Sequence, residues 1–156
     1  MTNLPWAEEI NYWQSSQSSP DTWMDKSKKL IQQLSGTILA EGFGSDSQGR
    51  SAYMLAFEIG GDRFKVIWPV LPSKTRNERA ARIQAATMLH HDIKAKAMSA
   101  TVLGARAAFF SNWMLPDGRT AANASVAELS AGIPLLFQNP QLSAPLVGEI
   151  VEEGEA

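Results

Sequence analysis

The residues best suited to acid–base or metal chemistry are His90, His91 and Asp92, a run that holds both histidines of the chain. Adjacent residues on a helix point about 100° apart, so the two imidazoles are poorly placed to bind one ion. Metal-binding helices use spacings such as i and i+4, and the positions four residues after the histidines hold Lys94 and Ala95. We therefore predict no metal site, and expect one histidine to be partly buried and the other solvated.

Motifs for nucleophilic catalysis and for nucleotide hydrolysis are missing from the sequence. The chain has no cysteine and no G-x-S-x-G, and the glycines at 42, 44 and 49 do not fit a Walker A loop. The carboxylates Glu41, Glu58 and Asp62 fall on predicted strands or turns, and nothing in the sequence pairs them with one another for catalysis. We predict a protein without catalytic residues or cofactor; a small enzyme that uses His90 or His91 as a base is the weaker alternative.

Charge is unevenly distributed along the chain, although the net charge is only −2. Residues 50–106 hold ten Lys or Arg against four acids, a balance of +6, whereas residues 1–49 and 107–156 carry −3 and −5. A basic centre between acidic ends suggests an anionic partner for the centre. An ordinary solvated helix face explains the same charges equally well.

Basic side chains follow one another on a predicted strand and on the helix start that comes after it. Because strand and helix start are close in sequence, we expect their basic residues to line one groove that binds a phosphate backbone, with aromatic residues stacking bases. For both aromatic candidates a position in the core is the alternative. The groove residues are Arg63, Lys65, Arg76, Arg79 and Arg82, and the aromatic candidates are Tyr53 and Trp68.

The element that must position these residues is a long, Ala-rich, proline-free stretch from Thr75 to Trp113. Thr75 and Glu78 stand in the T-x-x-E spacing of a capping box, which predicts a helix start. A continuous helix of this length would extend over roughly 58 Å. We expect it to bend at Gly104 or to project and pack on a partner, and we expect residues 95–113 to be mostly buried.

The remaining elements predict an α+β domain with a β-β-β-α core, in which an antiparallel sheet packs on the long helix. Apolar residues alternate with other residues along 52–59 and 63–70, which predicts one buried face for these strands, and Pro69 is expected at a strand end or edge. The third strand follows a Gly60-Gly61 turn, and Asp21 is the expected N-cap of the helix at 22–34. We place a single domain at residues 1–147 and a flexible acidic tail at 148–156. The predicted segments are helices at 5–13, 22–34 and 125–131, strands at 37–43, 52–59 and 63–70, and an extended stretch at 133–147.

The stretch from Tyr53 to Phe110 resembles the core of single-strand annealing proteins, which include the phage Red-beta and Erf types and the eukaryotic recombination mediators. The shared features are a β-hairpin, a third strand and an Ala-rich helix with internal lysines and a closing Leu-Gly, here Lys94, Lys96 and Gly104. The resemblance implies an oligomer that binds single-stranded DNA and pairs complementary strands without a cofactor; RNA is the alternative ligand. The His90-His91-Asp92 run has no counterpart in that family.

Composition sets the remaining expectations. The hydrophobic fraction of 44% is that of a globular protein, and the absence of cysteine suits a reducing cytoplasm. The chain has no run of about 18 apolar residues and no signal-peptide pattern, so we expect no membrane association. The leading hypothesis is an oligomeric protein that binds and anneals single-stranded DNA, whose acidic tail contacts a protein partner. The alternative is an oligomeric scaffold without a nucleic-acid role.

Overall fold

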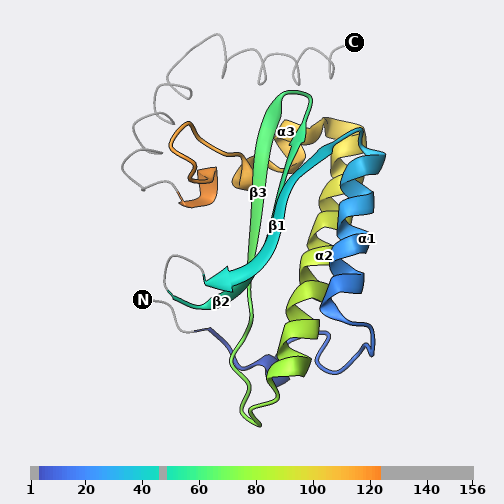
Figure 1. The fold of residues 1–156 in the computed structure, drawn as a ribbon. Helices are drawn as coiled ribbons and strands as arrows, with labels where there is room; N and C mark the ends of the chain where they lie inside the picture. The colour runs from blue at the N-terminus through green and yellow to red at the C-terminus, as the bar shows by residue number, and fades with distance from the viewer. Residues whose placement is uncertain (1–3, 46–48, 124–156) are drawn as a thin grey trace, which may run out of the picture. The chain divides into compact units, whose positions relative to one another are not determined.

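Two helices cover one face of a three-stranded antiparallel sheet in the computed structural model (Figure 1), which confirms the α+β prediction. The structure describes residues 4–45 and 49–123. The helices α1 and α2 run in the same direction, so both begin at the same end of the sheet. The elements are η1 (Ala7–Glu9), α1 (Pro20–Gln33), β1 (Thr37–Ser45), β2 (Ser51–Ile59), β3 (Asp62–Pro69), α2 (Glu78–Leu103), α3 (Ala105–Ala108), η2 (Phe110–Asn112) and η3 (Ala121–Asn123).

The described residues belong almost entirely to one compact unit, Met1–Ala121, and Ala122–Ala156 form a second unit. The predicted helix at 125–131, the extended stretch at 133–147, the acidic tail at 148–156 and the domain boundary between the last two lie outside the described residues.

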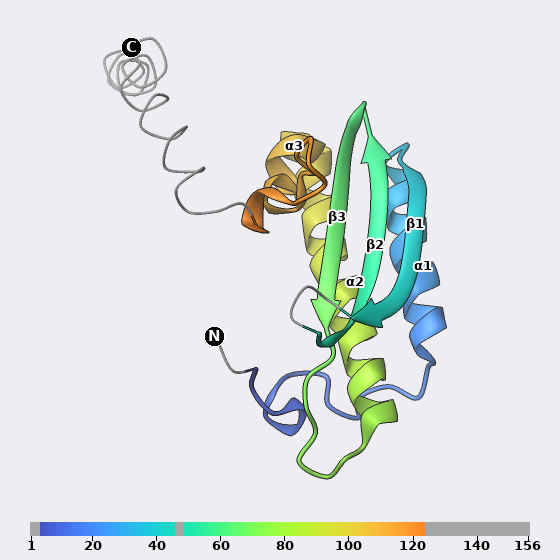
Figure 2. The ribbon, with the colours of Figure 1, turned by 60° about the vertical axis from the view of Figure 1, so that its left-hand side comes forward.

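Alternation of side chains along β2 and β3 builds the core, as the sequence predicted. Leu55 and Phe57 on β2, and Phe64 and Val66 on β3, are at most 2% exposed and face the two helices. The aromatic rings of Phe57, Phe64 and Phe109 lie 5.2–5.6 Å apart between centroids, a spacing at which aromatic pairs attract one another. The sheet order is β1-β2-β3, seen face-on in Figure 2, so β1 is an edge strand.

The tight turn between β2 and β3 follows from two glycines. Gly60 and Gly61 have φ values of 60° and 87°, the left-handed conformation that a two-residue hairpin turn needs at both positions. Without a Cβ, glycine adopts this conformation at little steric cost. The register of the hairpin is regular from Ile59–Asp62 to Ala52–Pro69, so Pro69 lies at the strand end, as predicted.

Both helices start at a different residue from the predicted cap. The N-cap of α2 is Asn77, whose Oδ1 accepts a hydrogen bond from the Ala80 N–H at 3.1 Å, because the hydroxyl of the predicted cap Thr75 instead donates to Glu8. The N-cap of α1 is Ser19 rather than Asp21, with Pro20 in the first helical position that suits proline. The helix α2 is therefore 26 residues long, or about 39 Å.

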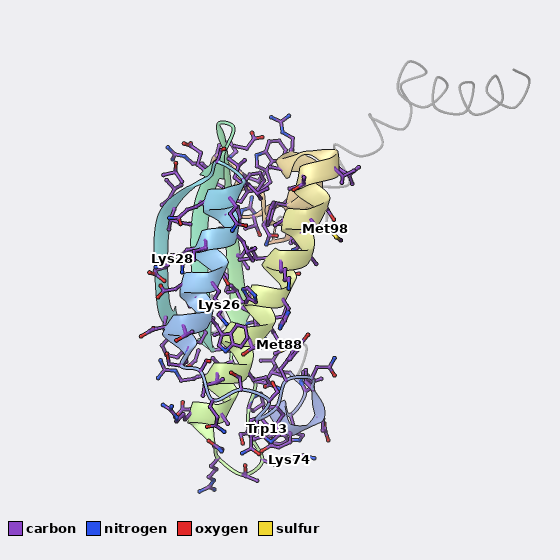
Figure 3. All side chains as sticks on the ribbon, turned by 90° about the vertical axis from the view of Figure 1, so that its right-hand side faces the viewer. Trp13, Lys26, Lys28, Lys74, Met88 and Met98 are labelled. Carbon is purple, nitrogen blue, oxygen red and sulfur yellow. The ribbon has the colours of Figure 1, made fainter. Side chains whose placement is uncertain are left out.

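The predicted bend at Gly104 is confirmed, but the prediction that residues 95–113 are mostly buried is wrong. Gly104 has φ 94° and separates α2 from α3. Exposed fractions of Met98, Val102 and Leu103 are 70%, 78% and 68%, and Phe110 is 53% exposed. Only one face of this part of α2 meets the sheet, and Met98 lies on the side of α2 away from α1 (Figure 3).

Candidate nucleic-acid interface

The basic residues predicted to line one groove lie on two sides of the sheet. Phe64 and Val66 of β3 pack under α2, so the alternate residues Arg63 and Lys65 lie on the opposite face, away from the helices. Arg63 pairs with Glu58 across the hairpin, with 3.4 Å between Nε and Oε1. The prediction of a single groove is therefore wrong, because the sheet separates these two cations from those at the start of α2.

The lysines suggested by the family resemblance also lie away from the start of α2. Lys94 is exposed on the second half of that helix. Lys96 forms an ion pair with Asp92 at 3.0 Å and donates a hydrogen bond to the Asn112 side chain at 2.9 Å. These contacts give Lys96 a structural role that connects α2 to the segment after α3.

Tyr53 and Trp68, the predicted stacking residues, pack into the protein rather than facing a ligand. Tyr53 is 3% exposed, and Trp68 is partly buried against the main hydrophobic cluster, as its alternative assignment to the core proposed. Burial raises the pKa of the Tyr53 phenol, although the hydrogen bond from Arg82 and its positive charge act to lower that pKa. The phenol therefore stays neutral at physiological pH, and its oxygen accepts the 3.1 Å hydrogen bond from Arg82 Nε.

Phe43 is the aromatic residue that the sequence analysis missed. It is 43% exposed near the end of β1, and its ring lies 4.8 Å from that of Tyr53 between centroids. The Arg82 guanidinium lies over the Phe43 ring, with 4.1 Å from Cζ to the centroid, a cation–π distance. The sequence offered one signal: Phe43 is the aromatic residue of the predicted strand at 37–43.

Three adjoining hollows surround Arg79 and Arg82 at the end where both helices begin; we call them together the arginine groove. Their volumes are ≈ 390, ≈ 410 and ≈ 460 Å³. Arg79 borders the first two hollows, and Arg82 and Asp21 border the first and the third. The groove thus runs from Gln14 at one end to Phe43 at the other.

The arginine groove is lined by both positively and negatively charged groups. The N-termini of α1 and α2 carry partial positive charge, which adds to that of Arg79 and Arg82. Asp21 and Glu78 line the first hollow, and Asp25 and Glu41 line the third. Lys28 forms ion pairs with Asp25 and Glu41, so Asp21 and Glu78 remain to offset the charge of the two arginines. The lining is therefore close to neutral and disfavours a densely charged ligand. Arg76, the remaining predicted residue, is exposed in the loop before α2 with φ 58°.

The two histidines lie in an aromatic cluster between the helices and the N-terminal segment. Tyr12 stacks on His91, with 4.6 Å between centroids, and Trp23 lies 5.2 Å from His90. Burial lowers the pKa of His90, and the nearby charges of His91, Lys26 and Lys94 act in the same direction. His90 is 9% exposed and His91 is half-buried, so both rings have a packing role. Within residues 4–45 and 49–123, no three His, Cys, Asp or Glu side chains are grouped so that they could hold a metal ion.

No known protein family, curated protein or solved structure matches the chain. Among the described residues, none of the helices has the length and apolar character needed to cross a membrane.

Proposed function

We propose that this protein binds single-stranded nucleic acid, DNA in the first place, along the arginine groove, and that it acts as an oligomer in strand annealing or protection. The observation that carries the proposal is the arrangement at Arg82. Its guanidinium lies on the exposed ring of Phe43, so a phosphate-binding group and a base-stacking surface adjoin each other. Single-strand binding proteins combine these two features, because a positive groove follows the backbone while aromatic rings stack the bases.

The shape of the groove also favours an extended ligand. The groove consists of three hollows in a row, each with a volume of a few hundred cubic ångströms and open to solvent. This shape suits an extended ligand better than one enclosed in a single chamber. A small-molecule site typically encloses most of its ligand. The resemblance of the hairpin, third strand and Ala-rich helix to single-strand annealing proteins supports the same function.

Binding to a fluorescent oligothymidylate at two or more salt concentrations tests the proposal. For Z phosphates contacted, the slope of log K against log salt is about −0.7Z for a single strand. Replacing Arg79 and Arg82 by alanine removes two cations and should make the slope shallower by about 1.4. The matched control replaces Arg63 and Lys94, two exposed cations outside the groove, and should leave the slope unchanged.

Two results would reject the proposal. One is the absence of binding at low salt, and the other is an equal loss of slope in both double variants. Equal losses would mean that only the overall positive charge of residues 50–106 attracts the nucleic acid.

A scaffold without a nucleic-acid role is the second candidate function, and one observation favours it. The large apolar side chains most exposed to solvent in the described chain, Met98, Val102 and Leu103, all lie at the end of α2, and Phe110 follows shortly after. Clustered apolar exposure of this kind marks surfaces of protein–protein contact. Assembly detected by light scattering, together with no nucleic-acid binding, would favour this candidate.

A further inference from the structure

The two edges of the sheet differ in how they are covered. At the β3 edge, Phe64 forms an antiparallel bridge with Trp113, and the Met114 N–H donates to the Arg63 carbonyl at 2.8 Å. Within the described part of the chain, β1 pairs only with β2. All its residues except Ile38 are exposed. The outer backbone groups of β1 are therefore available to another strand.

The available edge carries few of the features that normally prevent pairing between sheets. Protected edges use charged side chains, lysine above all, as well as proline, bulges or short strands. The strand β1 has nine residues, of which none is lysine or proline, and its one charged residue, Glu41, is paired with Lys28 of α1. Its bulge lies between Ile38 and Ala40, and the register with β2 is regular from Ala40 to Ser45. Two apolar side chains on this strand, Leu39 and Phe43, are 44% and 43% exposed.

We propose that β1 pairs with β1 of a second copy of this chain, antiparallel about a twofold axis at Gly42, and joins two sheets into one of six strands. The proposal deepens the oligomeric part of the proposed function and rests on that part alone. A twofold interface of this type is self-complementary, since each strand presents the same groups to the other. The partner is thus specified by the strand itself.

Charge determines the register. Pairing centred on Glu41 would place two carboxylates directly opposite each other, which is destabilising. Pairing centred on Phe43 would place the two Arg82 guanidiniums, each lying on its own Phe43 ring, next to each other. Pairing centred on Ala40 would draw the bulge into the ladder. Pairing centred on Gly42 avoids all three.

In the Gly42 register, Glu41 of one copy lies opposite Phe43 of the other, on the face covered by the helices. Within one copy, the Glu41 carboxylate already forms an ion pair with Lys28 of α1. The side chains of Glu41 and Phe43 border the same hollow as Arg82, so the Lys28-paired carboxylate of one copy would also lie near the guanidinium of the other. The same contact occurs twice across the axis. The Phe43 ends of two arginine grooves would then meet on one face of the joined sheet and form a longer path for a strand.

Cysteine cross-linking tests the register directly, because the chain contains no cysteine. No atom lies within 4 Å of a Cβ built at Gly42 or Gly44, so both positions accept a side chain. Residues directly opposite have Cβ atoms about 4.5–5.5 Å apart, close to disulfide range. The two copies of residue 44 would be four residues apart along the strands, or roughly 13 Å. Gly42→Cys should therefore cross-link under mild oxidation by copper phenanthroline in air, at least tenfold faster than Gly44→Cys.

A charge variant measures the contact without oxidation. Gly42→Lys places two ammonium groups opposite each other on the axis and should raise the dimer dissociation constant at least tenfold, measured by sedimentation. Gly44→Lys places lysine opposite Ala40 and should leave the constant within about threefold. Equal cross-linking at both positions, no cross-linking at Gly42, or an unchanged constant in Gly42→Lys would overturn the proposal. Both experiments omit nucleic acid, so their failure is distinct from failure of binding in the groove.

Discussion

Truncation of Phe43 separates a role in binding from a role in folding. The side chain is 43% exposed, so it buries little more than half of its surface in the folded protein. A fully buried Phe→Ala change costs about 3–5 kcal/mol, and half of that range is about 1.5–2.5 kcal/mol for Phe43→Ala. Loss of the cation–π contact with Arg82 adds about 0.5–1 kcal/mol at an exposed site. Most of a normal domain stability of about 5–15 kcal/mol would remain.

The effect of Phe43→Ala on binding should be large in comparison. Stacking of one base on an aromatic side chain contributes about 1–3 kcal/mol, which predicts roughly 5- to 150-fold weaker binding of oligothymidylate at fixed salt. The control is Leu39→Ala, a truncation on the same strand at a residue that is 44% exposed and outside the groove. Fluorescence anisotropy measures affinity, and urea unfolding verifies that both variants fold. A folded Phe43→Ala protein with the affinity of the parent would refute the assignment of Phe43 as the stacking surface.

Three further predictions concern stability. A Cβ at Gly36 would lie 2.6 Å from Ile31 Cγ2 and 2.8 Å from the Ile31 carbonyl oxygen. Gly36→Ala should therefore lower the free energy of unfolding, measured in urea, by about 1–3 kcal/mol. The control Gly42→Ala, whose Cβ meets open space, should leave that free energy unchanged or slightly higher. His90 has a lowered pKa in the folded chain because of its burial and nearby positive charges. The unfolded state binds the proton more tightly, so stability should decrease as the pH falls below about 6.5, and His90→Gln should reduce that decrease in thermal melts at pH 5–7. For Glu8, desolvation alone would raise the pKa, but hydrogen bonds from Ser73, the Lys74 N–H and Thr75 outweigh it and lower the pKa to about 2. The contribution of Glu8 to folding stability is therefore present above pH 4.5 and should be lost as the pH falls toward 2. An acid titration of Glu8→Gln should lack that loss.

Much of the fold followed from local patterns. The alternation along residues 52–59 and 63–70 identified β2, β3 and the face they bury, because successive side chains of a strand point to opposite sides. Gly60 and Gly61 identified the hairpin turn, and Gly104 the break after α2. Each of these features depends on the conformational preferences of a few neighbouring residues, which the sequence states directly.

The helix caps and the burial of α2 depended on distant parts of the chain. Thr75 matched a capping box, yet its hydroxyl is engaged by Glu8, 67 positions away, and Asn77 caps the helix instead. The apolar residues around Val102 predicted burial, but the other described elements leave their side of α2 uncovered. A pattern of apolar residues indicates which side chains favour burial, whereas only the packing of other elements decides which of them are buried.

The candidate site shows most clearly the difference between what the sequence predicts and what tertiary packing decides. The sequence determined that the centre of the chain is basic and that its cations lie on a strand and on a helix start. It did not determine that the sheet lies between Arg63 and Arg82, or that Phe43 and Arg82, far apart in the chain, are in contact. Those placements depend on which face of β3 packs under α2 and on the pairing of β1 with β2. Both are set by burial of apolar surface throughout the domain, so only the tertiary structure could bring together the residues of the arginine groove.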